Sequence, residues 1–170
     1  PALLVVGTGQ TQTRYDAMDG NGVFASDDDG ANWKSIGLTD TRHIGDLWID
    51  PRHENVMLVA ALGSLFGPGP ERGVFRTEDG GAHWTKVAYA DADTGAVDFG
   101  VDPGAPDVVY ASFWQVRRYP WQGYHIPQVG PGSGIWKSMD GGETWAKLET
   151  GIPEGAKGRI GMDIYRANPN

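Results

Sequence analysis

The chain contains no cysteine, which excludes disulfide bonds and thiolate metal sites. It also lacks any apolar run approaching the roughly 18 residues of a membrane-spanning helix, so membrane insertion is not expected. Positive charge is scarce: 14 lysine and arginine residues face 22 aspartates and glutamates, for a formal net charge of -8. Because nucleic-acid binding needs a positive surface, nucleic acid is not an expected partner.

Helical periodicity is a further absence, since no window of the sequence repeats its apolar residues at the helical spacing. What the chain has instead is 26 glycines, 11 prolines and seven tryptophans, with short β-rich runs between the turn residues. Its length of 170 residues suffices for one well-buried domain. The sequence therefore predicts a turn-rich, all-β fold.

Three octapeptides share the pattern Ser/Thr-x-Asp-x-Gly-x-x-Trp. Three matches at four fixed positions are a much stronger signal than a lone glycine motif, and their spacing is typical of repeat architectures. The matching residues are Ser26, Asp28, Gly30 and Trp33, then Thr77, Asp79, Gly81 and Trp84, and finally Ser138, Asp140, Gly142 and Trp145.

The octapeptides set the phase of the predicted strands, because each lies between the third and fourth strand of a four-strand unit. The sequence predicts three antiparallel β-propeller blades, over about 1–38, 43–89 and 96–149, with a closing strand at 158–166, all within one segment 1–170. The first and last blades would share strands out of phase, as in ring-closed propellers. Because three blades are too few for a ring, we expect a segment of a longer propeller or a homo-oligomer that completes the ring.

Within each octapeptide, the aspartate has two possible roles. It can accept backbone N–H bonds in a tight hairpin, with the glycine at positive φ and the tryptophan packed on the neighbouring strand. Alternatively, it is catalytic or binds calcium, although the run 27–29 lacks the further oxygen ligands that calcium needs. The structural role is favoured, because catalysis does not need one residue in every blade.

The octapeptides resemble the Asp-box, or BNR repeat, of sialidases, sortilin-like receptors and many bacterial proteins often labelled glycosyl hydrolases. The passages 36–45, 59–63 and 71–77 are similar to the sortilin-like bacterial group in particular. The resemblance spans nearly the whole chain. It implies a β-propeller and a secreted or periplasmic location, and it implies no single activity.

In such a propeller, the face opposite the octapeptides is where ligands usually bind. The longest loop on that face is 115–133, and an irregular loop of this length is more often functional than not. Its aromatic rings could stack on sugars or peptides and its arginines could bind carboxylates, or the loop could pack on its own blade or a neighbouring subunit. The candidate ligand-binding residues are Arg14, Tyr15, Arg42, Arg117, Arg118, Tyr119, Trp121 and Tyr124.

Three function classes follow. The favoured one is a non-catalytic binding or scaffold module for a peptide, protein or glycan, and a purely structural, assembling role is another. The alternative is a glycoside hydrolase, which needs two carboxyl groups about 5 to 10 Å apart, and the one pair nominated from the sequence is Asp40 with Asp91 or Asp93. A sialidase is disfavoured, because His125 stands where its substrate-binding arginine belongs. The four histidines lack metal-ligand spacing, so neither a metal nor another cofactor is expected.

Overall fold

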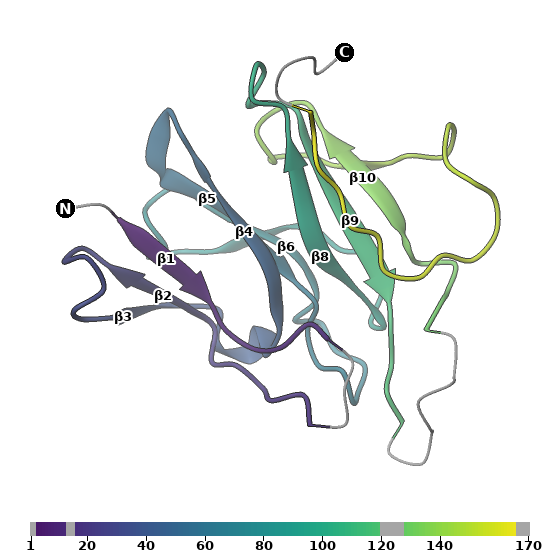
Figure 1. Ribbon diagram of the computed structural model, residues 1–170, viewed down its shortest axis with the longest axis horizontal. Coiled ribbons are helices and arrows are strands. Elements are labelled where there is room, and N and C mark those ends of the chain that lie inside the picture. The colour runs from purple at the N-terminus through teal and green to yellow at the C-terminus, as the bar shows by residue number, and fades with distance from the viewer. Residues whose placement is uncertain (1–2, 13–15, 120–127, 166–170) are drawn as a thin grey trace.

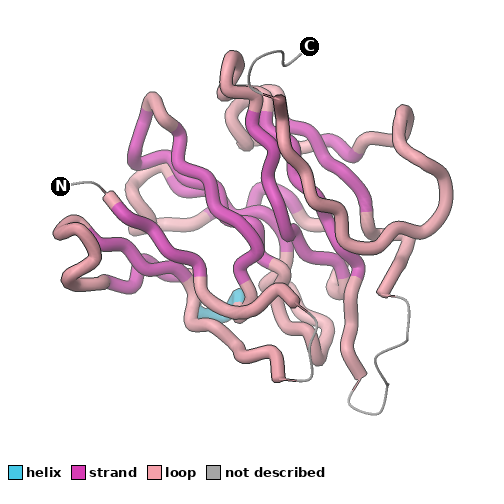
Figure 2. The backbone as a smooth tube through the Cα atoms, in the orientation of Figure 1, coloured by secondary structure: helices cyan, strands magenta, loops and turns pink. Residues whose placement is uncertain are grey.

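The computed structural model describes residues 3–12, 16–119 and 128–165, which form three antiparallel sheets (Figure 1). Sheet 1 comprises β1 (Leu4–Gly7), β2 (Val23–Ser26) and β3 (Lys34–Gly37). Sheet 2 comprises β4 (Ile44–Asp50), β5 (His53–Ala61), β6 (Gly73–Thr77) and β7 (Thr85–Ala88). Sheet 3 comprises β8 (Thr94–Val101), β9 (Val109–Gln115), β10 (Gly134–Ser138) and β11 (Ala146–Lys147). The helical content of these ranges is one 3-10 turn, η1 (Thr39–Thr41), seen as the short cyan segment in Figure 2.

The three sheets form an open arc. Each is a meander in which strands adjacent in sequence pair, with β4 and β8 as the inner edges of sheets 2 and 3. Sheet 1 has three strands because nothing in the described ranges pairs with the free edge of β1. The all-β, antiparallel expectation is confirmed, whereas the first and last sheets share no strand within the described ranges.

The predicted closing strand differs from the expectation. Over the described part, 158–165, this segment forms no strand, yet it runs beside β8 in Figure 1. Its backbone is tied to sheet 3, since the N–H of Met162 donates to Asp98 Oδ2 at 2.9 Å and the hydroxyl of Ser112 donates to the carbonyl of Ile160 at 2.8 Å. Residues 159–165 therefore lie where the inner strand of a fourth sheet would lie, and no strand of the described ranges pairs with them.

Apolar side chains fill the spaces between neighbouring sheets. Leu58 and Val74 of sheet 2 meet Phe113 of sheet 3 in the largest buried cluster, and Val23 of sheet 1 meets Val59 of sheet 2 in another. The second half of β5 thus buries both faces, with Leu58 packed toward sheet 3 and Val59 toward sheet 1. Such burial explains why the apolar residues of β5 run continuously rather than alternating with polar ones.

Aspartates on the inner strands connect one sheet to the next. Asp46 Oδ2 accepts the backbone N–H of Phe99 in the following sheet at 3.0 Å, and Asp98 Oδ2 accepts the backbone N–H of Met162 at 2.9 Å. Both aspartates follow a register shift, between Ile44 and Asp46 in β4 and between Ala96 and Asp98 in β8. Such bulges re-aim a side chain, so the carboxylate turns from its own sheet toward the next inner strand.

The three octapeptide turns have the same hydrogen-bond pattern. In the first, the Ser26 hydroxyl accepts the N–H of Gly30 at 2.9 Å, and Asp28 Oδ1 accepts the N–H of Asn32 at 2.8 Å. The side-chain amide of Asn32 also donates to Asp28, and this bond lowers the pKa of Asp28 to about 2. The corresponding bonds join Thr77 to Gly81, Asp79 to His83, Ser138 to Gly142 and Asp140 to Thr144. Each of these carboxylates therefore serves its own turn.

The three octapeptide tryptophans have different surroundings. The indole of Trp84 donates to the Ile36 carbonyl of the preceding sheet at 2.7 Å and lies against Gly37. Trp145 is half-buried between sheets 2 and 3, whereas Trp33 is 42% exposed. The difference follows from position, because no sheet precedes sheet 1 in the described ranges.

Candidate functional site

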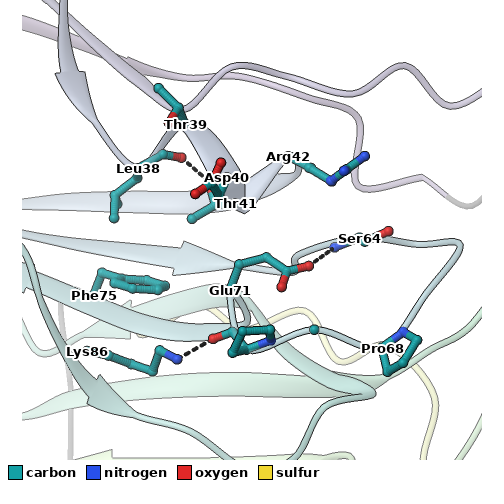
Figure 3. Close-up of a pocket in the computed structure, with 12 residues that line it drawn as sticks. Leu38, Thr39, Asp40, Thr41, Arg42, Ser64, Pro68, Glu71, Phe75 and Lys86 are labelled. Atoms are coloured by element: carbon teal, nitrogen blue, oxygen red, sulfur yellow. Dashed lines mark hydrogen bonds between the residues drawn. The ribbon is translucent and has the colours of Figure 1, made fainter.

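An open pocket of about 710 Å³ lies between sheets 1 and 2. One wall is the connection 38–42 from β3 to β4, and the other is the loop 64–71 from β5 to β6 (Figure 3). Since strands alternate in direction, these connections lie at the opposite end of the sheets from the octapeptide turns. The remaining lining residues, Phe75 and Lys86, come from the outer strands β6 and β7.

The pocket presents an aromatic ring beside charged groups. Phe75 is half-buried, and Lys86 Nζ lies 5.6 Å from its ring centroid while donating to the carbonyl of Pro70. Glu71 is held in place by the backbone N–H of Ser64, at 3.1 Å from Oε1. Figure 3 shows Glu71, Phe75 and Lys86 across the opening from the connection 38–42.

The connection 38–42 carries unusual backbone conformations. Leu38 and Arg42 have φ of 56° and 58°, which non-glycine residues rarely adopt, and both flank the turn that holds Asp40. The turn is fixed by Thr41, whose N–H and hydroxyl both donate to the Leu38 carbonyl, at 3.1 and 2.7 Å. Backbone strain of this kind persists where surrounding structure enforces it, and it clusters at functional sites. Asp40 is consequently presented at the pocket on a rigid turn.

Behind this wall lies a buried histidine. His43 has no exposed surface, and its Nε2 lies 3.1 Å from Asp19 Oδ1. Asp19 Oδ2 in turn accepts from Arg42 Nη1 at 2.5 Å, which fixes the arginine beside the pocket. Burial lowers the pKa of His43, although the Asp19 carboxylate opposes that shift. The imidazole is therefore neutral at pH 7 and lies behind the wall, not in it.

A buried arginine organises the loops on this face. The side chain of Arg72 is inaccessible to solvent and donates to backbone carbonyls of three segments. Its acceptors include Leu62 at 2.9 Å, Asp93 at 3.1 Å and Val116 at 3.3 Å, and it also donates to Ser64. Burial lowers the pKa of Arg72, but an arginine stays charged in any protein. Arg72 thus ties the 64–71 loop to the two neighbouring connections.

The candidates named from the sequence fall into different places. Asp40 and Arg42 line the pocket, whereas Asp93 forms an ion pair with Arg117, and Asp91 accepts from the Thr94 hydroxyl at 2.8 Å. Asp91 and Asp93 do not line the pocket that contains Asp40.

The remaining candidates are engaged or lie outside the described residues. Arg117 also contacts Tyr119, with its guanidinium 5.7 Å from the ring centroid, and Arg118 is 5% exposed with its N–H bonded to the Leu65 carbonyl at 2.7 Å. These contacts pack the described start of the 115–133 loop onto the protein. Outside the described residues lie Arg14, Tyr15, Trp121 and Tyr124.

The sequence did not point to Glu71, Phe75 or Lys86 as site residues. Phe75 and Lys86 occupy ordinary strand positions, where an aromatic ring and a lysine need no functional explanation. In the described ranges, no group of three or more His, Asp and Glu side chains is placed to hold a metal ion. Those ranges also contain no helix long and apolar enough to cross a membrane.

Comparison with known proteins gave structural matches only. No family model matches the chain, and no curated protein matches it at a significant level. Its structure is similar to that of an ancestral GH74 enzyme, with 17% identity, a TM-score of 0.55, and coverage of 76% of this chain and 15% of that one. The GH74 enzyme of Niastella koreensis shares 18% identity with a TM-score of 0.52, over 79% of this chain and 19% of that one. The GH74 xyloglucanase of Xanthomonas campestris shares 18% identity with a TM-score of 0.58, over 92% of this chain and 22% of that one.

These likenesses concern the fold. GH74 is a β-propeller glycoside hydrolase family, and this chain spans less than a quarter of the length of each enzyme. At this identity, the shared arrangement of sheets is what the comparison shows. The three sheets thus have a propeller-like, all-β fold that is not closed into a ring.

Proposed function

We propose that this chain is part of a β-propeller that binds carbohydrate in the pocket between its first two blades. One observation carries the proposal: the half-buried ring of Phe75 lines the same pocket as the carboxylates of Asp40 and Glu71. Sugar rings have apolar faces that stack on aromatic rings, and their hydroxyls donate to carboxylates. The similarity to glycoside hydrolases supports a glycan over a peptide as the ligand.

The form of the pocket supports a hydrated, polar ligand. It is open to solvent, and charged side chains of both signs line it, Asp40 and Glu71 against Arg42 and Lys86. A small apolar ligand would favour a closed site lined mainly by hydrophobic side chains. The balanced charge favours a neutral sugar over a strongly ionic one.

Binding without catalysis is the preferred form of the proposal. Glu71 is already engaged by the Ser64 N–H, and Asp40 is exposed, whereas the general acid of a glycosidase usually lies in apolar surroundings. A second candidate, glycoside hydrolysis, is favoured by one observation: two carboxyl groups from different walls line the same pocket.

We also propose that the three octapeptide turns are Asp-boxes and that the blades follow the boundaries 1–38, 43–89 and 96–149. Support comes from the shared hydrogen bonds of the turns and from the sheet boundaries. In this assignment the octapeptides are scaffold, and the ligand binds on the opposite face.

Titration calorimetry with xyloglucan and β-glucan oligosaccharides tests the binding. Phe75→Ala should weaken affinity about 3- to 10-fold, because ring stacking contributes about 0.5–1.5 kcal/mol. Glu71→Gln should weaken it by a similar factor. Phe66→Ala is the matched control, since Phe66 is 45% exposed on the same loop but does not line the pocket. Absence of binding at millimolar sugar, or an equal effect of the control, would contradict the proposal.

Release of reducing sugar from the same oligosaccharides separates the two candidates. Binding without turnover supports the non-catalytic form. Turnover that disappears in both Asp40→Asn and Glu71→Gln would instead establish hydrolysis in this pocket.

A further inference from the structure

The pocket between sheets 1 and 2 is bordered by a lysine that the fold holds in place. Lys86 lines the pocket from β7, and its Nζ donates to the carbonyl of Pro70 in the 64–71 loop. Sheet 3 repeats this contact, because Lys147 Nζ donates to the carbonyl of Pro131 at 3.2 Å. The contact between lysine and carbonyl therefore belongs to the repeat, and it fixes an ammonium group at the edge of the pocket.

A second aromatic ring contacts the same lysine. Lys86 Nζ lies 5.6 Å from the ring centroid of Phe75 and 4.7 Å from that of Tyr89. Because both distances fall within the range of a cation–π contact and run to one atom, the two rings are neighbours. Tyr89 does not line the pocket, yet it is 41% exposed. Its ring therefore extends the aromatic surface beyond the edge of the pocket.

Tyr89 also belongs to a connection that is bonded to the pocket wall. It begins the connection 89–93 from β7 to β8, in which the Ala92 carbonyl accepts the N–H of Gly69 at 2.9 Å. Gly69 itself lines the pocket. The pocket and the Tyr89 ring are thus joined through Lys86 and through this backbone bond, so their relative position is fixed.

The repeat shows that the fold does not require a ring at this place. The strand registers identify the equivalents of Tyr89 as Leu38 in sheet 1 and Thr150 in sheet 3. Both of those sheets form without an aromatic residue there. Sheet 2 packs on a sheet at either side, and Tyr89 nevertheless stays exposed. An exposed ring that the fold does not need, beside a pocket, points to a role in binding.

We infer that Tyr89 forms a second stacking site for carbohydrate, adjoining the pocket at Lys86, and that the ligand is a linear oligosaccharide contacting the rings of both Phe75 and Tyr89. The inference rests on the sugar binding proposed for the pocket. The face of a tyrosine ring suits an apolar sugar face, and a ring already held by a cation loses less freedom on binding. Lys86 has N–H groups beyond the one bonded to Pro70, and these can donate to the oxygens of the bound sugar.

Two stacking sites on one ligand make affinity depend on chain length. A short ligand contacts the pocket alone, whereas a longer chain of the same sugar also reaches the ring of Tyr89. The second contact then forms at high effective concentration, because the first contact already holds the ligand close to it. The gain in affinity with length should therefore depend on Tyr89.

Titration calorimetry with unbranched cello-oligosaccharides tests this dependence. We expect the wild type to bind the hexasaccharide at least about tenfold more tightly than the disaccharide. Tyr89→Leu should reduce this ratio about 3- to 10-fold, because leucine has no flat ring face. The fold tolerates leucine here, since Leu38 stands at the equivalent place in sheet 1. Tyr89→Phe retains the ring and should keep the ratio of the wild type.

Tyr110→Leu is the matched control. Tyr110 also has a lysine over its ring, with Lys137 Nζ 5.3 Å from the centroid. It pairs with Lys137 directly before the third octapeptide, at the opposite end of the sheets from the pocket. Tyr110→Leu should therefore leave the ratio between hexasaccharide and disaccharide unchanged.

The outcomes separate this inference from the proposed function. Equal ratios for the wild type and Tyr89→Leu, or an equal effect of Tyr110→Leu, overturn the second stacking site. Sugar binding in the pocket then still stands if Phe75→Ala weakens binding of the disaccharide. A wild type that binds neither sugar overturns the second stacking site and the proposed function together.

Discussion

Removing the hydroxyl of the first octapeptide residue should lower the free energy of unfolding by different amounts in different sheets. Ser138→Ala leaves the N–H of Gly142 without its acceptor, and that bond, 2.9 Å long, is buried. Ser26→Ala removes the equivalent bond to Gly30, also 2.9 Å long, but this turn is only partly buried. A buried donor without a partner costs about 1–3 kcal/mol, whereas a donor that water can reach loses only the net bond, about 0.5–1.5 kcal/mol.

We therefore expect Ser138→Ala to lower the free energy of unfolding by about 1 kcal/mol more than Ser26→Ala does. For a chain of this length, that difference corresponds to about 2–4 °C in Tm. Urea unfolding followed by tryptophan fluorescence gives the free energies, provided that the slope with denaturant is unchanged.

Ser138→Thr is the control, because threonine stands at the equivalent position in the second turn, Thr77, and keeps the hydroxyl. Ser138→Thr should therefore lower the free energy of unfolding only slightly. Equal losses for Ser138→Ala and Ser26→Ala, or a larger loss for the latter, would refute the reasoning that burial of the N–H sets the cost.

Three further predictions concern glycine, histidine and arginine. Gly142→Ala should destabilise the fold much more than Gly151→Ala, as measured by thermal unfolding of both variants. Both glycines have positive φ, but a Cβ at Gly142 would lie 2.7 Å from the Leu58 side chain, whereas a Cβ at Gly151 would meet no atom within 4 Å. Because burial lowers the pKa of His43 from 6.5, the unfolded chain binds a proton more readily, so stability should be complete above pH 6.5 and fall below it. Urea midpoints at pH 7.5 and 5.5 should differ more in the wild type than in His43→Gln, and parallel changes would contradict this. Arg72→Lys should lower the free energy of unfolding by about 3–5 kcal/mol, because lysine cannot reach the carbonyls of three segments at once and stays buried and charged. Backbone hydrogen exchange should then become faster in all three segments together. Faster exchange in one segment alone would argue against their coupling.

The sequence predicted the sheets well because each octapeptide marks the same place in the four-strand repeat, directly after the third strand. Ser26, Thr77 and Ser138 each end the third strand of a four-strand repeat, and the strands on either side follow from turn residues and β-branched runs. The octapeptide gives no information on whether a neighbour exists. Over its described part, 158–165, the strand expected at 158–166 does not form, because a strand needs a pairing partner and the described ranges supply none.

The candidate pocket was harder to predict. Asp40 and Arg42 were identified because they lie in a connection on the expected face, but the walls are completed by Glu71, Phe75 and Lys86, whose roles depend on how two sheets pack. No periodicity within one sheet reports that packing. The inner-strand aspartates can be recognised in the sequence, because Asp46 and Asp98 each lie five residues before the proline of an Asp-Pro turn.

The bonds from Asp46 to the N–H of Phe99 and from Asp98 to the N–H of Met162 also have a direction. In both, the earlier sheet supplies the acceptor and the later strand supplies the donor. During synthesis, each acceptor thus leaves the ribosome before the strand that it binds. Loss of one such aspartate should leave the preceding sheets intact and misplace only those that follow, so errors in this fold would spread toward the C-terminus and not toward the N-terminus.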